Sequence, residues 1–197
     1  MGVVDLTEVH ALRRRFTEKL NDRSHTNVDQ CFQCGKCSAG CPVVYAMDVL
    51  PHQVMRLSQA GQKDAVLNSR TIWICAQCVT CSTRCPRDVG ITEVMEALRV
   101  MSKEEGYRSP EPAVTAVDEA FLSSVRSHGR IHELGIIAVL KLRTKRFFDD
   151  LGMGMAMFFK GKISILPHRI KGRQQIHRIF DRVRDQAASP AEEVTRE

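Results

Sequence analysis

The sequence has no apolar run that approaches the ~20 residues needed to cross a bilayer. Its two longest apolar segments, 131–142 and 147–159, are interrupted by histidine and charged residues. Residues 1–20 contain three consecutive arginines and lack the apolar core of a secretory signal. These absences predict a cytoplasmic protein without direct membrane insertion.

Cysteine is absent outside two copies of one pattern, C-x2-C-x2-C-x3-C-P, which together contain all eight cysteines of the chain. The first copy begins at Cys31 and ends at Pro42. The second begins at Cys75, 44 positions later (75 minus 31), and ends at Pro86. This pattern is typical of [4Fe–4S] cluster ligands. Two copies predict two [4Fe–4S] clusters in one polypeptide, and they leave no free thiol for disulfide chemistry.

Two other roles of paired cysteines are less consistent with this spacing. Zinc sites usually combine separated C-x2-C pairs or include histidine, whereas here three cysteines crowd one loop. A disulfide framework requires an oxidising compartment, and the chain shows no secretory signal that would take it there. We therefore interpret the cysteines as cluster ligands.

The fourth cysteine of each copy precedes a proline, which biases that cysteine toward extended backbone and away from its own loop. In two-cluster ferredoxins this cysteine ligates the other cluster. We therefore predict crossed ligation, while an uncrossed arrangement, in which each copy holds its own cluster, stays open. The crossed sets are Cys31, Cys34, Cys37 and Cys85 for cluster 1, and Cys75, Cys78, Cys81 and Cys41 for cluster 2.

The formal net charge of +6 suggests nucleic-acid binding at first sight. Eight thiolates subtract eight charges and two oxidised clusters with 2+ cores add four, so the loaded protein carries about +2. The chain has one Trp and two Tyr, which leaves little aromatic surface for stacking on bases. We expect no nucleic-acid partner.

Apolar residues recur at helical spacing along most of the chain, and we find no run with the alternation of a strand. The 33 residues between Cys41 and Cys75 also show helical periodicity rather than hairpin signals. This predicts a mainly α fold, an α-helical ferredoxin core with N- and C-terminal helical extensions. The expected parts are a helix at 1–24, the two-cluster domain at 25–106, a helical extension for partner contact at 107–188 and a disordered tail at 189–197.

Capping signals predict several helix boundaries. Thr92 is the expected N-cap of a helix that ends at Gly106, and Thr144 is expected to open a later helix. His128 and His132 have the i, i+4 spacing that puts two metal-capable side chains on one helix face. Because no carboxylate completes an H-E-x-x-H pattern, we interpret them as surface residues.

The doubled cysteine run, the helical linker and the stretch from Phe158 to Pro167 resemble HdrC, the C subunit of heterodisulfide reductase. The resemblance covers most of the chain. It implies an electron-transfer subunit that connects a flavin-containing HdrA-type subunit to a catalytic HdrB-type subunit. Two alternatives stay open: an HdrC-like subunit of a bacterial sulfur-metabolism complex with another disulfide or thiol substrate, and a free-standing ferredoxin-type carrier.

The residues favour a carrier over a catalyst. The catalytic subunit of the resembled family uses adjacent cysteines, and this chain has no Cys-Cys pair. We therefore expect a non-catalytic subunit of an oxidoreductase complex, with no active site of its own. Lys36 lies in the first loop, and Arg84 and Arg87 flank Cys85. We expect these cations to raise the potential of cluster 1 unless solvent screens them.

Overall fold

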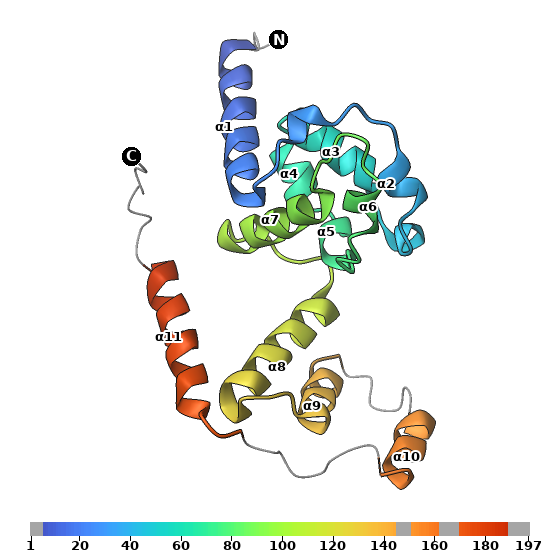
Figure 1. Ribbon diagram of the computed structural model, residues 1–197, viewed down its shortest axis with the longest axis vertical. Helices are drawn as coiled ribbons and strands as arrows, with labels where there is room; N and C mark the ends of the chain where they lie inside the picture. The colour runs from blue at the N-terminus through green and yellow to red at the C-terminus, as the bar shows by residue number, and fades with distance from the viewer. Residues whose placement is uncertain (1–5, 145–150, 162–169, 189–197) are drawn as a thin grey trace. The chain divides into compact units, whose positions relative to one another are not determined.

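The structure is a computed structural model that describes residues 6–144, 151–161 and 170–188 (Figure 1). These residues form helices joined by turns and contain no β-strand, which confirms the mainly α fold. The α-helices are α1 (Leu6–Ser24), α2 (Lys36–Ala39), α3 (Pro51–Gln59), α4 (Lys63–Leu67), α5 (Thr71–Ile74), α6 (Thr80–Thr83), α7 (Ile91–Glu104), α8 (Pro112–His128), α9 (Glu133–Thr144), α10 (Leu151–Phe159) and α11 (Arg173–Ala188). Two 3₁₀-helices are η1 (Val28–Gln30) and η2 (Val44–Ala46).

The chain divides into two compact units, residues 1–112 and 113–197. The first unit contains α1 to α7 and all eight cysteines, so α1 belongs to the same unit as the cysteine loops. The predicted tail at 189–197 lies outside the described residues. Within the described residues, no helix combines the length and the apolar character that a bilayer span requires.

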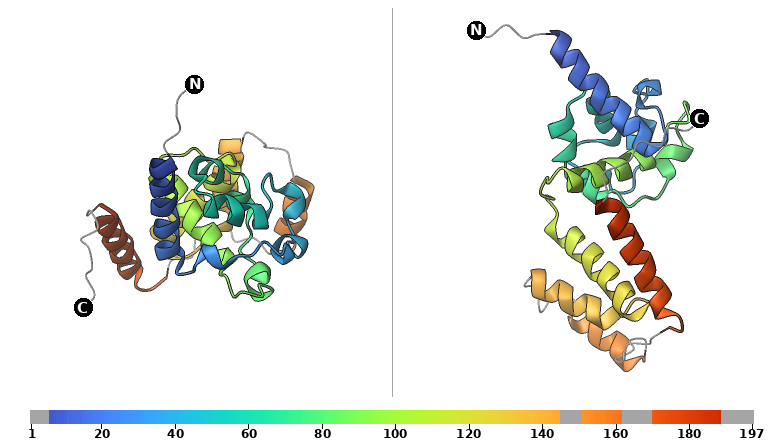
Figure 2. Two further views of the ribbon diagram at one scale, coloured as in Figure 1. Left: turned by 90° about the horizontal axis from the view of Figure 1, so that it is seen from above. Right: turned by 90° about the vertical axis from the view of Figure 1, so that its left-hand side faces the viewer.

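Helix α7 is the centre of the first unit and packs against α1, α4, α5 and α6 (Figures 1 and 2). Its apolar side chains recur every three or four residues, so one face enters the core. The largest fully buried side chains are Leu20, Met55, Leu67, Ile72, Met95, Leu98 and Met101. Each contributes about 1.5–3 kcal/mol by leaving water. This core anchors the loops that carry the cysteines.

Two of the predicted helix starts are wrong. Helix α7 begins at Ile91 with Gly90 as its N-cap, and the Gly90 N–H donates to Thr26 Oγ1 at 3.1 Å. Thr92 is therefore the second residue of the helix, and its hydroxyl is used elsewhere. Thr144 ends α9 rather than opening a helix. The predicted stop at Gly106 is confirmed, since that glycine follows the C-cap at φ 79°.

In the second unit, ion pairs join α8 to its neighbours. Arg126 of α8 lies 3.2 Å from Asp181 of α11, and Glu119 of α8 pairs with Arg143 of α9. Large apolar side chains of this unit are exposed, namely Val117, Phe121, Leu122, Ile131, Ile137, Val139, Leu142, Met155, Met157, Phe159, Ile170, Ile179 and Val183. Ion pairs thus join helices whose large apolar side chains are partly exposed.

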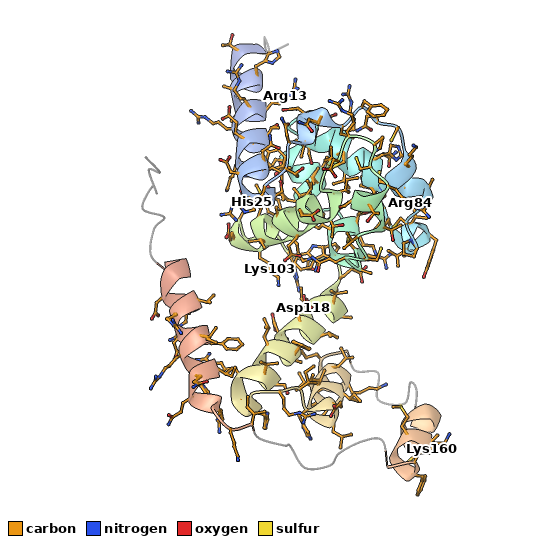
Figure 3. All side chains as sticks on the ribbon, viewed as in Figure 1. Arg13, His25, Arg84, Lys103, Asp118 and Lys160 are labelled. Carbon is orange, nitrogen blue, oxygen red and sulfur yellow. The ribbon has the colours of Figure 1, made fainter. Side chains whose placement is uncertain are left out.

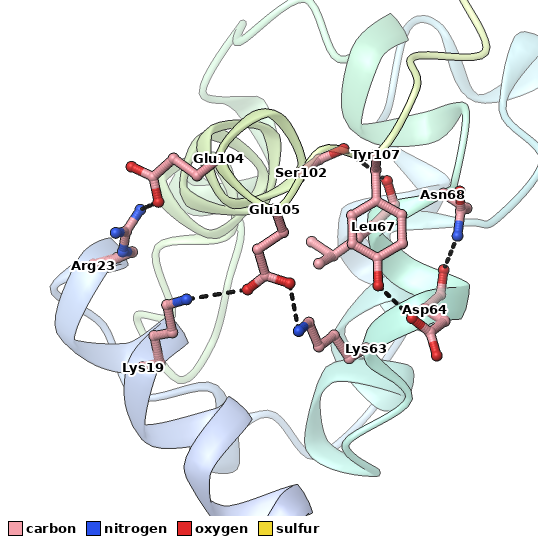
Figure 4. A network of polar contacts seen from close by, with 10 residues as sticks. All are labelled: Lys19, Arg23, Lys63, Asp64, Leu67, Asn68, Ser102, Glu104, Glu105 and Tyr107. Atoms are coloured by element: carbon pink, nitrogen blue, oxygen red, sulfur yellow. Dashed lines mark hydrogen bonds and ion pairs between the residues drawn. The ribbon is translucent and has the colours of Figure 1, made fainter. Parts of the chain in front are cut away.

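The carboxylate of Glu105 joins the C-terminal end of α7 to α1 and α4 (Figure 4). It accepts a hydrogen bond from Lys19 Nζ at 3.0 Å and pairs with Lys63. Partial burial raises the pKa of Glu105, but the hydrogen bonds and positive charges of Lys63 and Lys19 outweigh it and lower the pKa overall. Nearby, a hydrogen bond to Asp64 raises the pKa of Tyr107 to about 12.

Glu105→Gln is expected to lower the free energy of unfolding at neutral pH by at most about 1 kcal/mol, because both lysines are partly exposed and screened. A carboxyl whose pKa is depressed by folding stabilises above its unfolded pKa, and that contribution is lost as pH falls through the folded value. The difference between variant and wild type should therefore vanish in acid. Denaturant unfolding at several pH values measures it. Glu104→Gln, which loses only a pair with Arg23, is the matched control.

Candidate iron–sulfur site

None of the eight cysteines is in a disulfide, and they lie in two segments of the first unit, 31–41 and 75–85, called here the first and the second loop. Within each loop the second cysteine is the exposed one, Cys34 in the first and Cys78 in the second. Cys37 is buried, and the other five are half-buried. Each loop therefore turns one sulfur position outward and holds the rest against the protein.

The two loops have the same backbone conformation. Gln33 and Gln77 are equivalent positions, 44 residues apart, and both have positive φ, 65° and 50°. Gly35 and Val79 are equivalent in the same way, with φ of 75° and 62°. A short helix carries the third cysteine of each loop, Cys37 in α2 and Cys81 in α6. The cysteine motif is thus an internal structural repeat.

This conformation is energetically unfavourable at Val79. Positive φ is common for glycine but strained for a β-branched residue, at roughly 1–2 kcal/mol. Val79 adopts it where the first loop has Gly35. Strain of this kind persists where the surrounding structure requires it and is often found at functional sites. The repeat geometry is therefore maintained in the second loop against local preference.

A side chain with two hydrogen-bond donors, buried in Gln59 and half-buried in Arg99, fixes the entrance of each loop. Gln59 Nε2 donates to the carbonyl of Cys31 at 2.8 Å and to that of the residue three positions earlier at 2.9 Å. Arg99 makes the same pair of contacts to Cys75 and to the residue three positions before it, each at 3.0 Å. Gln59 lies at the end of α3 and Arg99 in α7, so these two helices hold equivalent places in the repeat.

A serine after the third cysteine links each loop to the start of the next long helix. Ser38 Oγ accepts the backbone N–H of His52 at 3.1 Å, and Ser82 Oγ accepts that of Thr92 at 3.1 Å. Both donors are the second residue of their helix, where a free N–H needs an acceptor. The side chains also meet: His52 Nδ1 lies 2.8 Å from Ser38 Oγ, and Thr92 Oγ1 lies 3.1 Å from Ser82 Oγ. Ser82 in turn donates to Glu93 at 3.2 Å.

Four cysteine sulfurs lie at hydrogen-bond distance from a polar group of the protein. The pairs are Gln33 Nε2 with Cys31 at 3.4 Å, Thr80 Oγ1 with Cys78 at 3.4 Å, Thr92 Oγ1 with Cys81 at 3.5 Å and the Val89 N–H with Cys85 at 3.3 Å. When the sulfur is a thiolate, the N–H or O–H is the donor. Donors of this kind tune the potential of a bound cluster.

Burial and neighbouring thiols set the acidity of the cysteines. Burial raises the pKa of Cys37 and of Cys75. Charge on Cys81 raises both further, and charge on Cys41 also acts on Cys75. A hydrogen bond to Thr80 lowers the pKa of the exposed Cys78. The thiols of the two loops are thus close enough to influence one another.

The three cations expected to act on cluster 1 are all exposed. Lys36, Arg84 and Arg87 have their side chains at the surface, where solvent and salt weaken their fields. Arg84 lies over Gly40, so close that a Cβ on this glycine would be 2.4 Å from the guanidinium (Figure 3). It is therefore beside Cys41 as well as Cys85, and it does not distinguish one cluster from the other.

His128 and His132 do not share a helix face, contrary to their spacing. His128 is the last residue of α8, and His132 precedes α9. The centroids of their rings are 5.9 Å apart. His128 Nδ1 forms a hydrogen bond with the Ser127 hydroxyl, and His132 Nδ1 accepts the Gly135 N–H. Among the described residues, no group of three or more His, Cys, Asp or Glu side chains converges on a single-ion site. A four-iron cluster is larger than one ion, and it takes thiolates spread around it.

The donor set of the two loops fits iron–sulfur clusters: four thiols each, sulfur-directed donors and partial burial. An all-helical unit with two such loops defines a two-cluster iron–sulfur protein. Residues 27–89 match the family model described as "4Fe-4S dicluster domain". The chain therefore carries a 4Fe–4S dicluster domain, and its cofactors are two [4Fe–4S] clusters.

Comparison with curated relatives indicates which two-cluster iron–sulfur proteins the chain resembles. The chain is 32% identical over 97 residues, 49% of its own length and 52% of the relative's, to the C subunit of the H(2):CoB-CoM heterodisulfide,ferredoxin reductase of Methanothermobacter marburgensis. It is 40% identical over 80 residues, 41% and 42% of the two lengths, to an iron–sulfur C subunit of the CoB–CoM heterodisulfide reductase of Methanocaldococcus jannaschii. It is 28% identical over 131 residues, 64% and 71%, to the C subunit of the ferredoxin:CoB-CoM heterodisulfide reductase of Methanosarcina mazei.

The chain is similar to C subunits of heterodisulfide reductases over about half its length. The chain spans about half the length of the curated relatives it matches first. The predicted resemblance is thereby confirmed, over about half of the chain rather than most of it. Residues 162–169 of its C-terminal stretch lie outside the described residues.

Proposed function

We propose that the chain is an electron-transfer subunit between a flavin-containing HdrA-type subunit and a catalytic HdrB-type subunit. The observation that carries this proposal is the exposure of one cysteine on each loop, Cys34 and Cys78, while the remaining six are buried or half-buried. A relay between two partners needs an accessible edge at each cluster, and the repeat supplies one on each loop. When bound, each cluster accepts and releases one electron at a time.

We also propose the crossed ligand sets, Cys31, Cys34, Cys37 with Cys85 and Cys75, Cys78, Cys81 with Cys41. Charge on Cys81 and on Cys41, the two members of its crossed set, raises the pKa of Cys75, while charge on Cys81 also acts on Cys37 of the other set. In this arrangement each loop contributes to both clusters. The residues of the chain then hold the two clusters at a fixed separation, which a relay requires.

The second unit supports partner contact rather than a free-standing carrier. Its helices α8 to α11 lie outside the cysteine-bearing unit and expose apolar side chains such as Phe121, Leu142 and Phe159. Exposed apolar surface of this kind is typical of contacts between proteins of a complex. We assign residues 113–188 to that role.

The test is electron delivery between defined partners. The full-length protein with both clusters is mixed anaerobically with the HdrA-type flavoprotein and the HdrB-type subunit of its source, and reduction of the HdrB-type subunit is followed by EPR. We expect reduction only when the chain is present, and loss of it when Cys75, Cys78 and Cys81 are all changed to Ala. Equal reduction without the chain would contradict the proposal. A chain that shuttles electrons without binding either partner in size exclusion would favour a free carrier.

A further inference from the structure

The two halves of the repeat differ in the side chain that meets the serine beside the third cysteine. In the second half this side chain is Thr92, whose hydroxyl lies 3.1 Å from Ser82 Oγ. In the first half it is His52, whose Nδ1 lies 2.8 Å from Ser38 Oγ. A threonine hydroxyl keeps its proton at ordinary pH, whereas histidine is the side chain that changes charge between about pH 5 and 8. Of these two equivalent positions, the first alone can exchange a proton with solvent near neutrality.

We propose that His52 is a proton-binding site coupled to the reduction of cluster 1. The inference rests on the proposed electron-transfer function and adds proton uptake to that function. One electron enters from the redox donor of that function, and one proton passes from a hydronium ion of the solvent to the imidazole. One O–H bond of the hydronium breaks and one N–H bond forms, and the charges added to the protein, one negative and one positive, balance.

Ser38 provides the physical link between His52 and the cluster. Its Oγ accepts the His52 backbone N–H at 3.1 Å and lies 2.8 Å from His52 Nδ1, and Ser38 directly follows the ligand Cys37 in the chain. While Nδ1 is unprotonated, the hydroxyl donates to it. Once Nδ1 is protonated, the ring donates to Ser38 Oγ and carries a positive charge beside the residue that follows Cys37. A positive charge close to a ligand favours the reduced cluster.

Two further observations support this link. Burial raises the pKa of the Cys37 thiol, and hydrogen bonding from the adjacent Ser38 opposes this rise. Both residues are buried, with 7% and 8% of their surfaces exposed, which limits screening by solvent. His52 is half-buried and remains open to a proton from water.

The surrounding charges leave the cluster as the main influence on His52. The charged side chains on α3, in the segment that leads into it and on the ends of the elements that meet it are Arg13, Asp29, Lys36, Asp48, Arg56, Lys63 and Asp64. Asp48 is held by hydrogen bonds from Val49, Arg70 and Thr71. Lys63 and Asp64 are engaged by Glu105 and Tyr107, and Arg13 lies against Gly61 beyond the far end of α3. Asp29 belongs to η1, which also meets that far end through Gln59.

Lys36 and Arg56 remain on the elements beside His52. His52 is the second residue of α3, directly at the N-terminus of that helix. The extra negative charge of the reduced cluster adds to the field of these groups and favours a proton on the imidazole. Proton uptake is accordingly tied to reduction, which is the coupling we propose.

The experiment is a redox titration of the full-length protein with both clusters, followed by EPR at several pH values from about 6 to 9. We expect the midpoint potential of one cluster to fall as pH rises. At its steepest the reduction equilibrium should change tenfold per pH unit, or about 59 mV for a one-electron couple. The second cluster should change much less. Cys31→Ala, which removes a ligand of the first loop, identifies the pH-dependent signal as that of cluster 1.

Two variants separate coupling from structure. His52→Thr copies the residue of the second repeat, and His52→Gln keeps a polar side chain without a titrating ring. Both should retain two clusters and lose the pH dependence of cluster 1. His25→Gln removes an exposed histidine of the same unit that adjoins the second loop, and it should leave the dependence intact (Figure 3).

A pH slope that persists in His52→Gln would overturn the proposal, as would two equally pH-independent clusters in the wild type. These outcomes leave the electron-transfer function standing, because both clusters would still titrate reversibly. Failure of that function would appear instead as clusters that take up electrons but do not pass them to the HdrB-type subunit.

Discussion

Cys41→Ala is expected to lose cluster 2 rather than the cluster of its own loop. Crossed ligation makes Cys41 the fourth ligand beside Cys75, and the proximity of these two thiols supports that pairing. A cluster with three thiolates is poorly held, so the iron content should fall from about eight toward about four per chain. Iron analysis and EPR of the reduced protein measure both effects.

The decisive comparison uses three single variants. With crossed ligation, the EPR signal that remains in Cys41→Ala is the one that remains in Cys75→Ala, and it differs from that of Cys31→Ala. With uncrossed ligation, Cys41→Ala instead matches Cys31→Ala. Cys85→Ala should give the reciprocal result and match Cys31→Ala. Should an alanine variant lose both clusters, the serine variant at the same position keeps an oxygen ligand and permits the same comparison.

The cysteine spacing predicted the two clusters. A motif of four cysteines within one short segment is a local signal, readable without knowledge of the rest of the chain. The helical linker was equally visible, because the apolar spacing at Val54, Met55 and Leu67 reflects burial in one core. Helix starts were less predictable. Thr92 has a side chain typical of an N-cap. It is instead the second residue of α7, two positions after the N-cap Gly90, and its hydroxyl contacts Ser82 and Cys81.

The repeat beyond the cysteines was not predictable from spacing. The two loops are 44 residues apart, but the helices that follow are only 40 apart, as His52 and Thr92 show. The segment after Pro42 is four residues longer than the one after Pro86, and η2 lies in it. A fixed-period search therefore loses the correspondence at that point. Equivalent residues also differ in type, since Gln59 and Arg99 share only the ability to donate two hydrogen bonds.

Gln59→Met is expected to destabilise the first loop clearly. Gln59 is 7% exposed, and its amide donates to two carbonyls at the entrance of the first loop. Methionine keeps the length of the side chain and removes both donors. The Val28 carbonyl keeps the Cys31 N–H at 3.1 Å, but the Cys31 carbonyl loses the donor of Gln59, so the free energy of unfolding should fall by about 1–3 kcal/mol. Thermal unfolding of the loaded protein, followed by circular dichroism, measures this loss. Gln30→Met, at an exposed position, is the control and should change stability by less than about 0.5 kcal/mol.

Arg99 donates an equivalent pair of hydrogen bonds at the second loop, so the effect of Gln59→Met should be confined to the first loop. Gln59 holds the carbonyl of Cys31, and Arg99 holds that of Cys75. Mild heating of Gln59→Met should therefore release iron first from the cluster that depends on Cys31, whereas Arg99→Met should release it first from the cluster that depends on Cys75. The signals of the cysteine variants identify which cluster is lost. If both variants lose the two clusters in the same order, these side chains support the fold as a whole, and the loops are not held independently.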